Sequence, residues 1–127
     1  MDELIAKVAA AIGVEADVAK SAVGHVLAFL QKELPEGPVK EFLDQVPGAH
    51  DAVAASNAAA DQGGGGLLGS LMSGGLMGLA AKLNAAGLDM GQIQKLGREI
   101  FGHAESVIGK EKVQQIASSI PGLSQIV

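Results

Sequence analysis

Three histidines, His25, His50 and His103, are the side chains of this sequence best suited to bind a metal ion or to transfer a proton near neutral pH. No two of them are spaced so that they would share one face of a helix. A metal site in a protein needs several ligands that converge on one point and further groups that orient them. The sequence therefore predicts no metal site, and it predicts that the histidines lie on partly exposed helix surface.

Two pairs of carboxylates, Glu33 with Glu36 and Glu41 with Asp44, are spaced so that they could meet across one turn of a helix. General acid–base catalysis by two carboxylates requires surroundings that separate their pKa values. Lysines and prolines surround both pairs instead, which is typical of a hydrated surface. We therefore expect these carboxylates to be solvated.

The remaining candidates for chemistry are two serines and a run of glycines. Ser70 and Ser73 lack the Gly-x-Ser-x-Gly frame of a nucleophile elbow and have no base placed for them. The run Gly63 to Gly66 lacks the Lys-Ser/Thr of a phosphate-binding loop and the strand that precedes it. The sequence thus predicts a protein that is not an enzyme and that has no cofactor.

The charge of the chain argues against a nucleic-acid partner. The net charge is −5 and the isoelectric point is about 5.0, so the basic patch that binds a phosphate backbone is missing. The charge is also uneven along the chain. Residues 1–53 carry nine acids and four bases, a net −5, whereas residues 78–127 carry four acids and five bases, a net +1.

The composition indicates a folded protein with an aliphatic core. Hydrophobic residues make up 48% of the 127 residues, too many for a disordered chain. The only aromatic residues are Phe29, Phe42 and Phe101, and there is no cysteine to form a disulfide. The sequence opens with acidic residues rather than the basic region of a signal peptide, so we expect a cytoplasmic protein.

Apolar residues recur at helical spacing along most of the chain, and no segment alternates for long enough to predict a strand. The stripes predict helices over residues 4–12, 18–34 and 39–46, and the alanine-rich run 49–60 could form another. The breaks between these stripes coincide with Gly13, Pro35, Pro38 and Pro47-Gly48.

The second half of the chain repeats this pattern. A shift of 74 residues carries helix breaks and apolar positions onto each other over about 50 residues. The matches include Gly13-Val14 with Gly87-Leu88, Leu34 with Ile108, Val39 with Val113, and Val46-Pro47-Gly48 with Ile120-Pro121-Gly122. One residue of slippage brings LIAKV at 4–8 onto LAAKL at 79–83. We interpret this as an internal duplication, with convergent helical patterning as the alternative.

The predicted fold is therefore all-α, a small helical domain built from two pseudo-repeats. Each repeat comprises a helix, a glycine turn, a long helix, a short helix and a Pro-Gly turn. The first repeat spans residues 1–53, an Ala/Gly-rich linker spans 54–66, and residues 67–127 hold a glycine-stepped helical extension followed by the second repeat.

The long helix of the second repeat has the better-specified start. Asp89 is expected to cap it, with Gln92 as the partner in a capping box. Leu88 and Ile93 have the spacing of a hydrophobic staple. Lys110 and Lys112 follow this helix, near its carboxyl end, where a helix dipole favours cations.

Several stretches together resemble the VcgC/VcgE-type family of small bacterial helical proteins of unknown function. They are a helix followed by Gly-Val, the amphipathic SAVGHVLAFLQKELP, a Val-Pro-Gly, the glycine- and leucine-rich middle, and the closing QQIASSIPGLSQIV. The resemblance covers nearly the whole chain. It implies an all-helical fold, and it carries over no catalytic or binding residue.

The middle segment GGGGLLGSLMSGGLMGLAA, residues 63–81, would place small residues on one helical face and large aliphatic residues on the other. The small, helix-packing face would be Gly66, Gly69, Ser70, Ser73, Gly74 and Gly78. The apolar face would be Leu68, Leu71, Met72, Leu76, Leu79 and Leu83.

Three interpretations of this segment remain open. Each interior glycine costs about 1 kcal/mol relative to alanine, so a helix here needs a packing partner. A flexible linker is tolerated because loop closure becomes only slowly more costly with length. The uncharged stretch is shorter than the roughly 20 residues that span a membrane, so membrane contact is possible but not favoured. A packed or partner-induced helix is the interpretation that we prefer.

Together these features predict a non-enzymatic helical interaction or structural protein that self-associates or binds a protein partner. The alternative is a membrane-surface or lipid-interacting protein that uses the Gly/Leu/Met-rich segment 67–83. A second alternative is a carrier of a small apolar ligand, for which the aliphatic composition is the only support.

Overall fold

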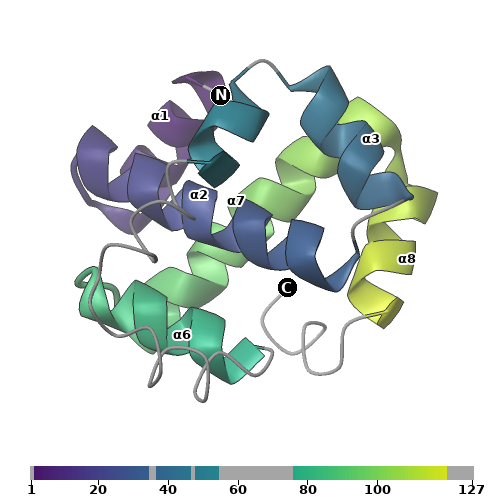
Figure 1. Ribbon diagram of the computed structural model, residues 1–127. Coiled ribbons are helices and arrows are strands. Elements are labelled where there is room, and N and C mark those ends of the chain that lie inside the picture. The colour runs from purple at the N-terminus through teal and green to yellow at the C-terminus, as the bar shows by residue number, and fades with distance from the viewer. Residues whose placement is uncertain (1, 35–36, 47, 55–75, 120–127) are drawn as a thin grey trace.

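The protein is all-α, as the sequence predicts (Figure 1). We describe residues 2–34, 37–46, 48–54 and 76–119 of a computed structural model. These residues contain helices, turns and bends, and no strand lies among them.

Six helices carry the architecture, three before the undescribed middle segment and three after it. They are α1 (Asp2–Ile12), α2 (Ala16–Glu33), α3 (Pro38–Gln45), α6 (Leu76–Ala85), α7 (Met90–Ile108) and α8 (Lys110–Ser119). Residues 49–54 are also helical. We call the described residues up to 54 the first unit and residues 76–119 the second unit.

The first helix of each unit ends in the same way. Gly13 follows α1 with a φ of 70°, and Gly87 follows α6 with a φ of 105°. Beyond the glycine, the N–H of Val14 donates to the carbonyl of Ala9, and the N–H of Leu88 donates to the carbonyl of Leu83, each at 3.1 Å. This bond closes a helix over a left-handed glycine. The two turns lie 74 residues apart, at the shift found in the sequence.

Two helices differ in extent from the helices predicted from the sequence. The first helix of the second unit begins at Leu76, three residues before the LAAKL match at 79–83. It therefore starts within the glycine-stepped extension. Of the alanine-rich run 49–60, residues 49–54 are helical, and the remaining residues lie outside the described part of the chain.

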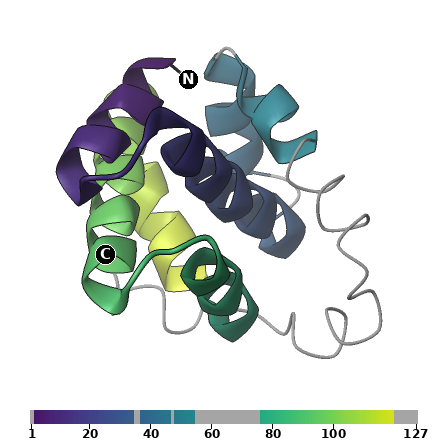
Figure 2. The same ribbon diagram turned by 90° about the vertical axis from the view of Figure 1, so that its left-hand side faces the viewer.

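The first helix of each unit packs on its own long helix and also on the long helix of the other unit, and we call this cross-packing the exchange of first helices. α1 of the first unit packs on α7 of the second unit, and α6 of the second unit packs on α2 of the first. α3 and α8, the short helices that follow the long helices of the two units, also contact each other. Figures 1 and 2 show α1 beside α7, and α6 leads through a short turn into the start of α7. Each long helix is thus covered by the first helices of both units.

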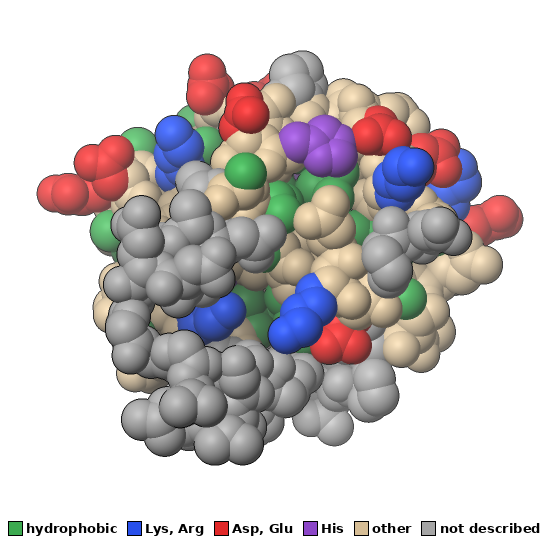
Figure 3. All heavy atoms as spheres, in the orientation of Figure 1, with side chains coloured by type: hydrophobic (Ala, Val, Ile, Leu, Met, Phe, Trp, Pro, Cys, Tyr) green, Lys and Arg blue, Asp and Glu red, His purple; other side chains and the backbone are tan. Residues whose placement is uncertain are grey.

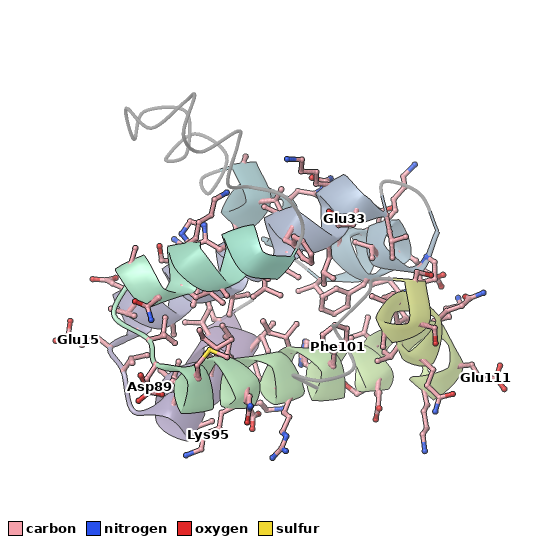
Figure 4. The ribbon with its side chains drawn as sticks, turned by 90° about the horizontal axis from the view of Figure 1, so that it is seen from below. Glu15, Glu33, Asp89, Lys95, Phe101 and Glu111 are labelled. Carbon is pink, nitrogen blue, oxygen red and sulfur yellow. The ribbon has the colours of Figure 1, made fainter. Side chains whose placement is uncertain are left out.

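The core that results is aliphatic and draws on every helix. Leu4 and Val8 of α1, Leu27 of α2 and Leu83 of α6 are at most 1% exposed. Figure 4 shows Phe101 pointing from α7 into the interior while Lys95 of the same helix points away from it. Among the described residues, Met90 is the one large hydrophobic side chain that is exposed.

The surface outside this core is mixed in charge. On the face seen in Figure 3, acidic and basic side chains are interspersed, and hydrophobic side chains show in small separate areas. No helix within the described residues combines the length and the apolar character needed to cross a membrane.

Alanine substitutions at three glycines test the helix ends. Gly13→Ala and Gly87→Ala should each lower the free energy of unfolding by about 1–2 kcal/mol, because a side chain is disfavoured at positive φ. No atom lies within 4 Å of the added carbon at either site, so crowding adds nothing. Gly102 lies inside α7 with the same open space, and Gly102→Ala should raise stability by about 1 kcal/mol.

Urea unfolding followed by far-ultraviolet circular dichroism measures all three variants. A neutral or stabilising effect of Gly13→Ala and Gly87→Ala would contradict the left-handed turns.

Candidate functional site

The polar groups that distinguish this chain gather where the two units meet. The start of α7 is the clearest case. The N–H of Gln92 donates to Asp89 Oδ1 at 2.8 Å, and the N–H of Asp89 donates to Gln92 Oε1 at 2.9 Å. This is the predicted capping box, which is therefore confirmed. Leu88 and Ile93, the predicted staple, are both buried.

Gln92 also joins the two units. Its Nε2 donates to the carbonyl of Ile12, the last residue of α1, at 2.9 Å. Carbonyls at the end of a helix have no partner within the helix and need one from elsewhere. One side chain therefore caps the start of α7 with its oxygen and the end of α1 with its nitrogen. Glu15 and Asp89, the residues that precede α2 and α7, lie toward the same end of the molecule (Figure 4).

An ion pair joins the opposite end of the units. Lys112 of α8 donates from Nζ to Glu41 Oε2 of α3, and both side chains are 41% exposed. The sequence places Lys110 and Lys112 at the carboxyl end of the preceding helix, but α8 already begins at Lys110. Lys112 thus lies in the first turn of a helix, where the dipole disfavours a cation, and Glu41 compensates for that. Glu41 is therefore paired with Lys112, and Asp44 contacts His50 instead of Glu41.

His50 and Asp44 form a contact within the first unit. His50 Nε2 lies 2.8 Å from Asp44 Oδ1, and both side chains are 54% exposed. Exposed pairs of this kind contribute little stability, about 0–1 kcal/mol. The sequence expectation of an exposed histidine is confirmed here.

His103 is half-buried on α7 and faces the first unit. Its ring meets the ring of Phe42 of α3 edge-on, with centroids 6.2 Å apart and planes at 75°. Its Nδ1 is buried, and no hydrogen-bond partner for this atom lies among the described residues. Burial and the nearby Lys7 of α1 lower the pKa of His103. Burial is the larger cause, and the charge of Lys7 from the other unit adds to it.

His25 is half-buried on α2, a helix that packs on α6 of the second unit. Burial is the main cause that lowers the pKa of His25, and the charge of Lys82 on α6 adds to it. Lys82 and Lys7 are the two lysines that correspond in the LAAKL and LIAKV segments. His25 and His103 do not correspond in the repeat, because a shift of 74 residues carries His25 to Glu99. For each histidine, the lysine whose charge lowers its pKa nevertheless belongs to the opposite unit.

The remaining predicted residues fall into two groups. Leu79 and Leu83 of the expected apolar face are buried in the core. Gly78 and Leu76 lie within α6. The other members of the two faces lie outside the described residues: Gly66, Leu68, Gly69, Ser70, Leu71, Met72, Ser73 and Gly74.

The described residues offer little that could hold a metal ion. No group of three or more histidine, aspartate or glutamate side chains among residues 2–34, 37–46, 48–54 and 76–119 is arranged to do so. Two serine hydroxyls in this part, those of Ser106 and Ser119, donate to backbone carbonyls of their own helices at 2.7 Å. The polar contacts between the units can fix their relative orientation.

Comparison with known proteins adds no assignment. No family model, curated protein or solved structure matches the chain. The resemblance to the VcgC/VcgE-type family therefore stays a prediction based on the sequence.

Substitution of Gln92 tests the bond between the units. Gln92→Ala removes both the capping box and the donor to Ile12, and should lower the free energy of unfolding by about 1–2 kcal/mol. Gln92→Glu keeps an acceptor for the N–H of Asp89 but removes the donor to Ile12. It should still lose about 1 kcal/mol, because the helix-end carbonyl is left without its partner.

Asp89→Ala is the matched control, since it removes the cap and leaves the Gln92 amide in place. Chemical unfolding at pH 7.5 measures the three variants. A Gln92→Glu variant as stable as the unsubstituted protein would show that the bond to Ile12 contributes nothing.

Proposed function

We propose that the chain is a duplicated, non-enzymatic helical protein that acts through protein–protein contact and self-associates. The observation that carries this proposal is the exchange of first helices between the units, α1 onto α7 and α6 onto α2. Such an exchange is the packing expected of two copies of one helical unit that have been joined in a single chain. A cytoplasmic location is part of the same proposal.

The helix boundaries support the duplication. A shift of 74 residues carries α1 onto the range 76–86, which overlaps α6, and carries α2 onto 90–107, which overlaps α7. The matching left-handed turns at Gly13 and Gly87 and their matching hydrogen bonds add to this support. Convergence would have to reproduce helix lengths, turn geometry and pairing of helices together.

Exchange of helices also supplies a route to self-association. The first unit of one chain and the second unit of another present the same complementary faces as the two units within one chain. Twenty-one residues separate the described units, including the glycines at 63–66. A connection of this length does not force a unit to pair with the other unit of the same chain rather than with that of a second chain. Association through these faces needs no surface beyond the one that builds the core.

The burial of Leu79 and Leu83 favours protein over lipid as the environment of this segment. Both residues belong to the apolar face that the membrane alternative requires, and both are at most 4% exposed in the protein core. Lys82, between them in sequence, is exposed. A helix that used these leucines to bind a membrane would have to give up its contact with α2.

Size-exclusion chromatography with light scattering, repeated with and without liposomes, tests this function. We expect the measured mass to rise from that of one chain to that of two chains as the protein concentration increases. We expect that the protein does not comigrate with the vesicles. The single chain should have a radius of gyration near that of a compact chain of this length, about 14 Å. Refractive index is the suitable detector, because the chain has no Trp or Tyr.

Two results would contradict the proposal. Small-angle scattering that fits two separate beads on a string would contradict the docking of the units. A strictly monomeric chain over the whole concentration range, or one that floats with the liposomes, would contradict self-association as its mode of action.

A further inference from the structure

We propose that two copies of this chain associate by reciprocal exchange of units, in which the first unit of each chain packs on the second unit of the other chain. Every contact between units then forms twice and joins two different chains. Lys112 of one chain pairs with Glu41 of the other, and Gln92 of one chain caps Ile12 of the other. This inference rests on the proposed self-association and names the residues that carry it.

The contacts between the units join residues on opposite sides of the undescribed middle segment. Gln92 Nε2 donates to the carbonyl of Ile12 across 80 positions of the sequence, and Lys112 pairs with Glu41 across 71. α1 packs on α7 and α6 packs on α2, where Leu83 of α6 is 1% exposed. None of these contacts includes a residue of the segment 55–75. Units of two different chains can therefore make them as well as units of one chain.

The length of the chain between the units permits this arrangement. The 21 residues at 55–75 can span at most about 70 Å when fully extended. A compact chain of this size has a radius of gyration of only about 14 Å. The connection is therefore long enough to join two units that are docked on different chains.

The rest of the described surface offers less for a dimer to bury. Among the described residues, Met90 is the one exposed large hydrophobic side chain. On the face seen in Figure 3, charges of both signs are interspersed and the apolar areas are small and separate. Homodimer interfaces are more apolar than such a surface. The contact between units has this apolar character, which favours it as the surface that binds a second copy.

The strength of the exchanged dimer follows from the identity of its contacts. The closed monomer and the exchanged dimer contain the same contacts, so the energy of these contacts cancels between the two states. What remains is the effective concentration of one unit near the other within a chain, which is on the order of millimolar. The unsubstituted protein should therefore dimerise toward that concentration. Because the exchange is reciprocal, it closes at two chains.

Reversal of the charges at Glu41 and Lys112 distinguishes the exchange from other modes of association. Glu41→Lys places two cations together, and Lys112→Glu places two anions together, both in the monomer and in a dimer of one variant. Only an exchanged dimer with one chain of each variant restores attraction, and it does so at both contacts. This mixed dimer should dissociate at a roughly tenfold lower concentration than the dimer of the unsubstituted protein, the equivalent of about 1.4 kcal/mol over the two contacts.

Native mass spectrometry of the full chains, with one variant isotope-labelled, measures the pairing. The two variants are mixed in equal amounts and incubated in urea below the unfolding midpoint, so that the units can separate. They are then returned to a buffer of low ionic strength at pH 7.5. We expect more mixed dimers than random pairing gives. Both side chains are 41% exposed, so the substitutions leave the core intact.

Glu3→Lys and Lys7→Glu are the matched control pair. They change the charge of the chains by the same amounts, but Lys7 and Glu3 lie 3.6 Å apart within α1, so an exchange of units cannot restore this contact. Their mixture should pair at random.

Random pairing of the Glu41→Lys and Lys112→Glu chains, or an equal excess of mixed dimers in both mixtures, would overturn the exchange. In that case, dimers of the unsubstituted protein would still support self-association, through a different surface. If no chain formed dimers up to millimolar concentration, both the exchange and the proposed self-association would be contradicted.

Discussion

The exchange of first helices is the constraint on which the rest of this structure depends. α1 packs on both α2 and α7, and α6 packs on both α2 and α7, so each long helix is buried by helices of both units. The sequence offers few large aromatic side chains, so the core has to be built from many aliphatic contacts spread over all the helices. Connection of both units in one chain reduces the entropic cost of bringing them together, because the second unit is always nearby.

Apolar burial supplies the stability of this contact, and the polar groups supply its register. A buried leucine contributes about 1.5–3 kcal/mol, whereas a half-exposed ion pair such as Glu41–Lys112 contributes about 0–1 kcal/mol. The bond from Gln92 to Ile12 has a different role, because it ties the end of α1 to the start of α7. Together the two polar contacts fix the units at opposite ends of the interface.

The sequence predicted those features that depend on neighbouring residues. The apolar stripes predicted where the helices lie, and Gly13, Gly87 and the Asp89–Gln92 capping box predicted where helices end or begin. These features could be predicted because each depends on interactions between residues that are close in sequence. The contacts from Gln92 to Ile12 and from Lys112 to Glu41 cross 80 and 71 residues. These contacts depend on which helices pack against each other. The apolar stripe of one helix shows which face is buried, but it does not show which helix covers that face. The lowered pKa values of the histidines escaped prediction for the same reason.

The proposed duplication explains why the two crossings resemble each other without being identical. In a dimer of identical units every contact occurs twice, so a substitution changes both copies at once. In one chain each copy can change alone. Gln92 corresponds to Val18, so only one crossing carries the bond that caps the other unit's helix. His103 corresponds to Phe29 in the repeat, and His25 corresponds to Glu99.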